Sequence, residues 1–481
     1  MNIATIINRH DGDRLALIDG DVQVTYGELR DRVDAVRARL HQADVGPDDP
    51  LAILAGNEVD FAVATLAGLG LGARIVPVRP GSPLPELERK LASVRPKLMV
   101  LGEAGAWITS DGIDVGVPTL DLAVDGDAVA ADAPPVIDRD PDDIAFLMLT
   151  SGVASDAKVA MLSHGNLAWA QDAILDRGDL GLQPDDVALG VLPFSHIFGL
   201  NLVLLATLKV GGTVVLQRRF DEVESLQLVK EHGITTLAGA PPMWQRWAAA
   251  DVPDDSMATI RHASSGAAAL PLAVYEAVLA RFGIEVAEGY GLTETSPIVT
   301  WSRGIAVRPT SVGKVIEGAE VVLVEPDGTP VDAGDTGEVV IRSPGVFKGY
   351  LNSPELTDAV LTEDGWFWSG DVGVFDGDGY LYLVDRIKDV IIVSGFNVYP
   401  SEVEGVLMEH PDVRGAVVVG AEDLDTGETV VAHVLGSASA EELDVFARAN
   451  LSRYKCPTSY EFVDELPVAA TGKLIRRELR R

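Results

Sequence analysis

Hydroxyl side chains, a glycine and a lysine gather in the segment TSGVASDAK, residues 150–158. An apolar segment predicted to be a buried strand ends just before it, and a helix is predicted to begin near residues 163–166. Loops of this kind bind phosphate oxygens through backbone amides and an ammonium group. The segment is not a Walker loop, because GxxxxGK[ST] is not satisfied. Alone it is typical of a polar surface loop, so its assignment as a phosphate loop depends on the motifs that accompany it.

Further polar motifs follow along the chain, next to predicted strands and turns. They are LPFSHIFG at 192–199, YGLTET at 290–295, WFWSGD at 366–371, DRIKDVIIVSGFNVYPSEVE at 385–404 (the joint) and TGK at 471–473. In kind and order they resemble the adenylate-forming superfamily of acyl-CoA synthetases, 4-coumarate-CoA-type ligases, luciferases and peptide-synthetase adenylation domains. The resemblance spans about Thr25 to Arg481 and is strongest to bacterial fatty-acyl or aryl acyl-CoA ligases.

The resemblance implies an ATP-dependent carboxylate–CoA ligase for fatty-acyl or aryl acids. Such an enzyme forms acyl-AMP and then acyl-CoA, releases pyrophosphate and AMP, and uses ATP, Mg²⁺ and coenzyme A. A carboxylate attacking the α-phosphate is an anion approaching an anion, so fixed positive charge between them lowers the barrier. The resemblance gives this role to Lys473, whose loss would cost about 3 kcal/mol, roughly a hundredfold in rate. Otherwise Lys473 is one more cation in the basic tail, residues 473–477.

The resemblance also assigns a nucleotide site. Glu294 would hold Mg²⁺ with help from Thr150, since this cation prefers oxygen ligands. Tyr290 would stack on adenine, Asp371 would accept hydrogen bonds from the ribose hydroxyls, and Arg386 would contact ribose or phosphate. The other implied residues are Ser151, Gly152, Ser155 and Lys158 in the phosphate loop, Gly266, Ala267 and Ala268 along the base, and Gly291 and Thr293 beside Tyr290. Each has an ordinary alternative role. Asp371 would be a turn residue, Glu294 a carboxylate at the start of a helix, and residues 266–268 small residues that pack closely beside a strand.

A second half-reaction is implied after the small C-terminal domain swings about Lys388. Gly395 would then line the pantetheine tunnel, or else simply end a strand at a turn. Lys473 would leave the site during this step, so that the thiol of CoA reaches the acyl-adenylate. His196 would stand at the mouth of the acyl pocket, and residues 243–247 would shape it. The alternative for both is a place in the apolar core.

The phosphate loop departs from the family form TSG-[ST]-[ST]-G-x-P-K-G. Residues 153–157, VASDA, lack two hydroxyl groups, a glycine and the proline, and Val159 replaces a further glycine. Trp368 and Val468 also replace residues that are commonly basic. These changes leave two alternatives open: an acyl-AMP ligase that loads a carrier protein, and a degenerate, non-catalytic acyl- or nucleotide-binding protein. The first ranks below a CoA ligase, because the extra insertion of such ligases before the joint is absent.

The elements that must position these residues follow an α/β pattern. Strands near 51–55, 74–78 and 98–101 alternate with helices and predict one doubly wound layer, and strands from 144–150 to 284–288 predict a second. Short strands at 320–325 and 338–342 predict a small antiparallel β-barrel. Thr25 and Glu28 form a capping box before an amphipathic helix. The predicted domains are 1–385, a hinge at 386–389, and a mobile α+β domain at 390–481.

The joint is predicted to contain a buried strand at 390–393 and then a helix. Ser401 and Glu404 are predicted to cap that helix through its free amides. The charged residues 385–389 alternate in sign and are too polar for a core, which favours a hinge.

Composition excludes several classes of protein. The chain has 481 residues and a formal net charge of −35, which disfavours nucleic-acid binding. Its one cysteine, Cys456, excludes a disulfide framework and suits a reducing cytoplasm. We find no secretory signal, no apolar run of about 18 residues, and no zinc motif. The expected partners are therefore a small carboxylic acid, ATP and CoA.

Overall fold

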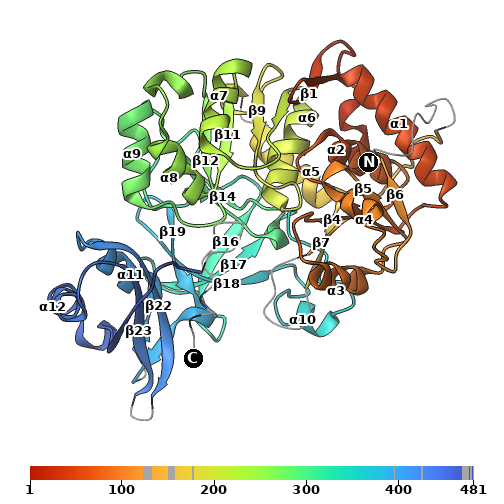
Figure 1. Ribbon diagram of the computed structural model, residues 1–481. Coiled ribbons are helices and arrows are strands. Elements are labelled where there is room, and N and C mark those ends of the chain that lie inside the picture. The colour runs from red at the N-terminus through yellow and green to blue at the C-terminus, as the bar shows by residue number, and fades with distance from the viewer. Residues whose placement is uncertain are drawn as a thin grey trace.

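Four sheets organise the molecule. The computed structural model describes residues 1–122, 133–149, 158–175, 178–394, 396–423, 426–467, 476 and 479. Three of the sheets form a large lobe, and the fourth lies in a small lobe made from the C-terminal part of the chain (Figure 1). The α/β class, with a large N-terminal and a small C-terminal domain, is confirmed.

The first sheet is mostly parallel and has six strands in the order β6-β5-β3-β4-β7-β8. These are β3 (Pro50–Leu54), β4 (Arg74–Val78), β5 (Leu98–Leu101), β6 (Thr119–Asp121), β7 (Ile144–Leu149) and β8 (Val159–Ser163). Side chains alternate between its two faces, as strand geometry requires. Leu51 and Ile53 join the core towards the second sheet, whereas Ala52 and Leu54 pack with α3 (Leu84–Val94) and α4 (Trp107–Ser110).

The second sheet has nine strands in the order β15-β14-β13-β12-β11-β9-β10-β1-β2. These are β1 (Leu15–Asp19), β2 (Val22–Thr25), β9 (Val187–Gly190), β10 (Thr213–Leu216), β11 (Thr236–Gly239), β12 (His262–Ser265), β13 (Ala287–Tyr290), β14 (Thr300–Trp301) and β15 (Lys314–Val315). Its outer face is covered by α7 (Glu222–His232), α8 (Pro241–Ala249) and α9 (Leu272–Phe282). From β1 to β13 neighbouring strands are parallel, so their carboxyl ends share one edge.

The core between the two sheets is built from apolar helices. It includes α1 (Tyr26–Gln42), α2 (Val59–Gly70) and a π-helical segment η5 (Phe198–Leu205). The predicted capping box of α1 is confirmed, because the Thr25 side chain accepts from the Glu28 amide and the Glu28 side chain accepts from the Thr25 amide. Nearby helices are α5 (His164–Leu175), α6 (Ala206–Val210) and the short η1 (Ile3–Ile7).

One strand assignment from the sequence is wrong. The segment 144–150 was expected to begin the second doubly wound layer, but β7 lies in the first sheet, parallel to β4 and antiparallel to β8. An apolar run predicts a strand but not its partner, which here lies about seventy residues earlier in the chain, where Ile75 faces Phe146. The strands β1 and β2, which the sequence did not predict, complete the second sheet instead.

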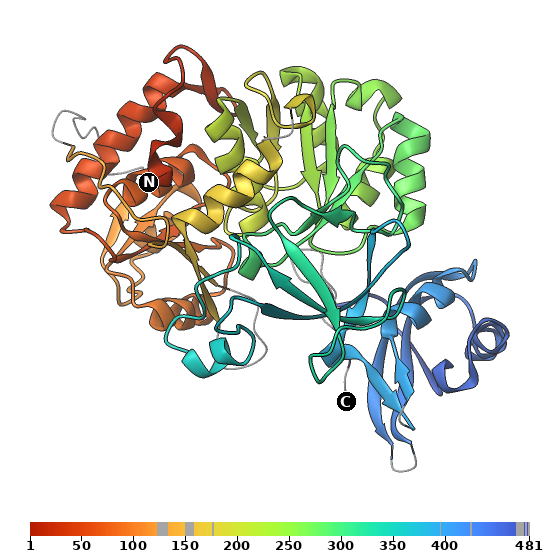
Figure 2. The ribbon, with the colours of Figure 1, turned by 180° about the vertical axis from the view of Figure 1, so that it is seen from behind.

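The third sheet is antiparallel, as expected, but its four strands form an open sheet and not the predicted β-barrel, because β16 and β19 at its two edges do not pair. It contains β16 (Glu320–Val324), β17 (Gly337–Arg342), β18 (Phe367–Phe375) and β19 (Leu381–Arg386), paired in that order. Seen from behind, these strands lie below the two parallel sheets and next to the small lobe (Figure 2). Asp376 turns the β18–β19 hairpin, since its carboxylate accepts from the amides of Asp378 and Tyr380. The short α10 (Pro354–Asp358) precedes β18.

The small lobe has a core of its own. Its strands β20 (Ile391–Val393), β21 (Phe396–Val398), β22 (Val413–Asp423), β23 (Gly427–Gly436) and β24 (Ser459–Phe462) pack with α11 (Pro400–Met408) and α12 (Ala440–Asn450). This core contains residues between Ile391 and Tyr460 and none from the large lobe. The joint therefore connects two separately packed units.

Two predictions for the joint are wrong in detail. The strand β20 is not buried on both faces, because Ile392 is 52% exposed. Ser401 and Glu404 do not form a capping box. Instead the Ser401 amide donates to the Asp385 carboxylate at 2.9 Å, and Glu404 accepts from the Val418 amide at 2.7 Å. The Ser401 hydroxyl donates to the Val384 carbonyl, so both side chains bind partners outside their own helix, which local spacing cannot reveal.

Among the helices in the described part of the chain, none has the length and apolar character needed to cross a membrane.

Replacing Trp247 by alanine is expected to destabilise the large lobe by about 3–5 kcal/mol, the range for a buried tryptophan. Trp247 is fully buried and meets Trp244 edge to face at 5.0 Å. Thermal or urea unfolding measures the loss. Leu272→Ala is the control, because Leu272 is 46% exposed on α9 and its removal should change stability by less than about 0.5 kcal/mol. Equal effects of the two changes would contradict this packing.

Candidate active site

Loops that carry predicted site residues leave the second sheet at one edge. His196 follows β9, residues 266–268 follow β12, and Tyr290 ends β13. Because these strands are parallel, their carboxyl ends meet on the same side. This edge of an open α/β sheet is where ligands commonly bind.

Tyr290, Asp371 and Arg386 form a connected polar chain. The Tyr290 hydroxyl donates to one Asp371 carboxylate oxygen at 2.7 Å, and Arg386 Nε lies 2.8 Å from the other. Asp371 and Arg386 face each other across β18 and β19, so strand register brings them together. Tyr290 and Asp371 are only 7% and 5% exposed. Burial, followed by the charge of Asp371, raises the pKa of the Tyr290 phenol well above its ordinary value.

Glu294 has a partner that the sequence did not suggest. The Tyr350 hydroxyl donates to Glu294 Oε1 at 2.7 Å, and Lys158 Nζ lies 4.9 Å from the centre of the Tyr350 ring. Burial and the charge of Glu294 raise the pKa of the Tyr350 phenol. Tyr350 therefore links the end of the phosphate loop to Glu294. A single tyrosine outside any motif gives no local signal of such a role.

Glu288 fixes the loop that follows β12. It is 3% exposed, lies opposite Ser265 in the β12–β13 pairing, and accepts from the Leu270 amide at 2.9 Å. Burial raises the pKa of the Glu288 carboxyl to about 7, against the opposing effect of the amides it faces. The sequence analysis missed this residue, although it stands just before the YGLTET motif.

The glycines and alanines of the site have steric constraints. A Cβ on Gly266 would lie 3.0 Å from the Phe198 ring, and one on Gly291 would lie 1.7 Å from the Pro297 carbonyl oxygen. Ala267 has a φ of +70°, which is unusual for a residue with a side chain. Ala267 and Ala268 are exposed, so they face solvent at the sheet edge. Close packing, the alternative role, therefore holds for the two glycines.

Three other predicted residues are exposed or partly exposed. Thr293 shares the short helical turn η7 (Thr293–Thr295) with Glu294. His196 is partly exposed, and its Nδ1 accepts from the Phe198 amide at 3.4 Å. Lys388 is exposed in the turn η8 (Ile387–Asp389), within the joint. The predicted residues that lie outside the described part of the chain are Thr150, Ser151, Gly152, Ser155, Gly395 and Lys473.

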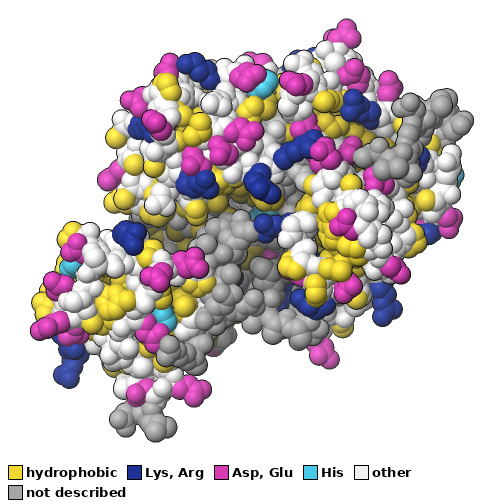
Figure 3. All heavy atoms as spheres, in the orientation of Figure 1, with side chains coloured by type: hydrophobic (Ala, Val, Ile, Leu, Met, Phe, Trp, Pro, Cys, Tyr) yellow, Lys and Arg dark blue, Asp and Glu magenta, His cyan; other side chains and the backbone are white. Residues whose placement is uncertain are grey.

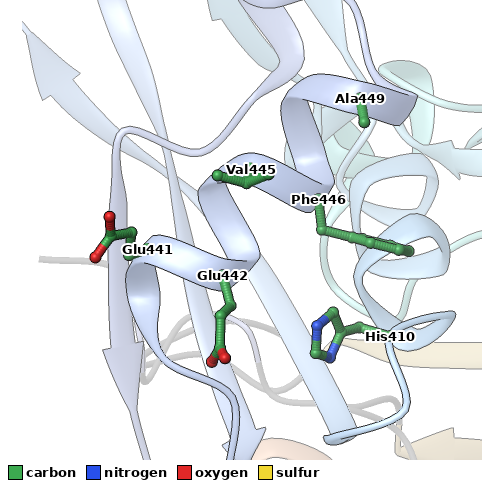
Figure 4. Close-up of a pocket in the computed structure, with 6 residues that line it drawn as sticks. All are labelled: His410, Glu441, Glu442, Val445, Phe446 and Ala449. Carbon is green, nitrogen blue, oxygen red and sulfur yellow. The ribbon is translucent and has the colours of Figure 1, made fainter.

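A shallow hollow of about 480 Å³ lies elsewhere, on the small lobe (Figure 4). It is lined by His410, Glu441, Glu442, Val445, Phe446 and Ala449, none of which the sequence analysis singled out.

Acidic side chains are spread over the visible face of both lobes, as the net charge of −35 requires (Figure 3). Within the described residues, no group of three or more histidine, cysteine or acidic side chains could hold a metal ion by itself.

Replacing Glu288 by glutamine is expected to change how stability depends on pH. The carboxyl has a pKa of about 7 in the folded chain and an ordinary value of 4.5, so between these values the folded chain holds a proton that the unfolded chain has released. Stability present below the ordinary value is therefore lost as the pH rises towards 7, by up to about 3 kcal/mol. Glu288→Gln removes this loss, because the amide stays neutral and its oxygen still accepts from Leu270.

Urea midpoints near pH 5 and pH 8 check this prediction. The advantage of Glu288→Gln over the wild type should be larger at the higher pH. Glu276→Gln, an exposed change on the adjacent helix α9, is the control and should show no such trend. An advantage that is independent of pH would contradict the proton linkage.

Comparisons with known proteins identify the family of this chain. A family model described as AMP-binding enzyme matches residues 5–351, and one described as AMP-binding enzyme C-terminal domain matches residues 402–473. Feruloyl-CoA synthase from an Amycolatopsis species is 37% identical over 97% of this chain and 95% of its own. The 4-coumarate–CoA ligase 3 of Oryza sativa subsp. japonica is 33% identical over 98% and 89%.

Solved structures match along the whole chain as well. ATP-bound MatB from Rhodopseudomonas palustris has a TM-score of 0.92 at 30% identity, covering 100% of this chain and 98% of that one. The apo form of the same protein has a TM-score of 0.80 with the same identity and coverage. The sequence match, the fold and the motifs agree, and the chain belongs to the AMP-binding enzyme family, the adenylate-forming superfamily.

Proposed function

We propose that this protein is an ATP-dependent, AMP-forming carboxylate–CoA ligase acting on an aryl or fatty acid. The observation that carries the proposal is the connected polar chain Tyr290–Asp371–Arg386 at the sheet edge, with Glu294 on the adjoining turn. The named relatives are CoA synthases and ligases, which supports CoA as the acceptor rather than a carrier protein. The retained polar chain argues against a degenerate binding protein.

The nucleotide site is inferred from the hydrogen-bond donors and acceptors of Asp371 and Arg386 that other protein groups do not use. An ionised carboxylate has about four acceptor positions, so Asp371 still accepts from ribose hydroxyls after binding Tyr290 and Arg386. Arg386 is partly exposed, and its guanidinium has donors left for ribose or phosphate oxygens. Residues 266–268 and the face of Tyr290 would line the base. Lys158 and the phosphate loop would contact the phosphate oxygens.

Magnesium fits the same site. Tyr350 occupies Oε1 of Glu294, so Oε2 remains as a hard oxygen ligand, and Thr150 would assist. A nucleotide-bound Mg²⁺ needs only one or two protein carboxylates, because substrate phosphates and waters supply the other ligands. The ion would neutralise charge on the departing pyrophosphate. The role of Glu294 would be to hold the Mg²⁺ ion next to the phosphate loop.

The two half-reactions need different groups. In the first, a carboxylate oxygen of the acid bonds to the α-phosphorus as the bond to pyrophosphate breaks, and Lys473 stabilises the converging anionic oxygens. In the second, the sulfur of CoA bonds to the acyl carbon as AMP leaves, and the thiol proton passes to solvent. Domains at 1–385 and 390–481, with the hinge at 386–389 centred on Lys388, would let Lys473 withdraw. Gly395 would then face pantetheine, and His196 would border the acyl group.

The chain has one cysteine and therefore no internal disulfide, which fits a reducing compartment, and we propose the cytoplasm. Cys456 is buried and free, and burial raises the pKa of its thiol, which disfavours the reactive thiolate.

Acid-dependent exchange of pyrophosphate into ATP is expected, because the first half-reaction is reversible. A panel of hydroxycinnamic, benzoic and fatty acids is incubated with ATP and Mg²⁺, and products are identified by mass spectrometry with and without CoA. At least one acid should give acyl-AMP alone and acyl-CoA with CoA. Adenylate without thioester would favour the carrier-protein alternative, and no exchange with any acid would favour the non-catalytic one.

Replacing Lys473 by alanine should lower adenylate formation by about a hundredfold while sparing thioester formation from supplied acyl-AMP. The reason is that its charge serves only the step in which two anions meet. Stopped assays of each half-reaction measure the split. Lys455→Ala is the matched control in the small lobe, because it removes a lysine that pairs with Glu402 and that has no role in the proposed site. Equal loss in both half-reactions would contradict the role of Lys473.

A further inference from the structure

Arg476 is the residue of the basic tail (473–477) that the structure describes, and its side chain forms an enclosed ion pair. Its guanidinium binds the Glu404 carboxylate of α11 at 2.6 Å. The two side chains are only 19% and 8% exposed. Glu404 uses its other oxygen to accept from the Val418 amide on β22. Arg476 thus attaches the basic tail to α11, the helix that begins within the joint.

Several carboxylates of the joint, on both sides of the proposed hinge, interact with the charge of this arginine. The charges of Asp385 at the end of β19, Asp389 in η8 and Glu404 in α11 all act on it. Asp385 is itself fixed, because it accepts from the Ser401 amide. Burial raises the pKa of the Glu404 carboxyl, and the charge of Arg476 opposes that rise. Without Arg476, these carboxylates would repel one another with no shared cation to compensate their charge.

The proposed hinge divides these partners. Glu404 and Arg476 lie in the small domain, whereas Asp385 belongs to the large one. Rotation about Lys388 would carry the Arg476–Glu404 pair away from Asp385, so the attraction across the joint exists only in some domain arrangements. Over the whole chain the structure has a TM-score of 0.92 with ATP-bound MatB and of 0.80 with the apo form.

We propose that Arg476 is a positioning residue for acyl-adenylate formation, which holds the basic tail against the joint by pairing with Glu404, on the helix whose Ser401 amide binds Asp385. It lies three positions after Lys473 in the sequence, so the fixed point of the tail is close along the chain to the proposed catalytic cation. The inference rests on the proposed function, since it assigns Arg476 to only one of the two half-reactions.

An ordinary surface ion pair would not have this effect. Arg448 and Asp444 pair at 2.7 Å on α12, but their side chains are 56% and 36% exposed. Exposed pairs contribute little, because water screens them and each side chain loses entropy. The enclosed Arg476–Glu404 pair is different, since removing one partner leaves a buried charge without compensation. Arg448→Gln is therefore the matched control in the same lobe.

The test compares both half-reactions in Arg476→Gln and Arg448→Gln, with the acid that gives the strongest exchange. Arg476→Gln should lower pyrophosphate exchange by about tenfold, because slight misplacement of a catalytic group has effects of that order or more. Thioester formation from supplied acyl-AMP should change by less than about twofold. Arg448→Gln should leave both rates unchanged. Unchanged exchange in Arg476→Gln, or equal loss of both half-reactions, would overturn the proposal.

A double-mutant cycle and a charge-retaining variant complete the test. Glu404→Gln keeps an oxygen for Val418 and removes the charge, so combining it with Arg476→Gln should lower exchange no further than either change alone. Additive losses would overturn the pairing. Arg476→Lys keeps the charge and should retain more exchange than Arg476→Gln, which provides a second comparison if the latter folds poorly.

Trypsin sensitivity of the substrate-free protein gives a readout that does not require turnover. Cleavage after Lys473 should be several-fold faster in Arg476→Gln than in Arg448→Gln if the pair holds the tail. If the wild type exchanges no pyrophosphate with any acid, the proposed function fails and the role of Arg476 in adenylation fails with it, while proteolysis still decides whether the pair fixes the tail. If the wild type is active and the two variants behave alike, only the inference on Arg476 fails.

Discussion

The buried carboxylate of Asp371 is the constraint on which the candidate site depends. A carboxylate removed from water must be compensated, and Asp371 receives a hydrogen bond from Tyr290 and an ion pair from Arg386. Tyr290 ends a strand of the parallel sheet, whereas Asp371 and Arg386 lie in the antiparallel sheet. One polar chain therefore fixes two separately built sheets at the edge where the loops emerge. Loss of any member would leave a buried polar group without its partner.

Other carboxylates repeat this arrangement around the same edge. Glu288 on β13 fixes the loop after β12 through the Leu270 amide, and Glu294 is held by the Tyr350 hydroxyl. In each case a side chain from one element satisfies a polar group of another, which restricts how the loops can move. A binding site requires such fixed loops, because disorder at the contact atoms weakens both affinity and rate.

Excess negative charge shapes the joint between the lobes. The chain carries a net charge of −35, and the joint gathers several carboxylates within a short segment. Three of these are matched by nearby donors: Asp385 by the Ser401 amide, Glu402 by Lys455, and Glu404 by Val418 and Arg476. The two lobes have separate apolar cores, and the hydrogen bond from the Ser401 amide to Asp385 joins α11 of the small lobe to the end of β19 in the large one.

The sequence by itself determined the local elements and the membership of the family. Alternating apolar runs predicted the doubly wound sheets, the Thr25 capping box predicted the start of α1, and the motifs predicted that Tyr290, Asp371 and Arg386 belong together. Tertiary structure alone decided which sheet β7 joins, that Ser401 and Glu404 serve partners other than their own helix, and that Tyr350 and Glu288 hold the site loops. The physical reason is that periodicity and capping act over a few neighbouring residues. Strand pairing and buried hydrogen bonds instead join residues that are far apart in the chain, and only the folded arrangement brings them into contact.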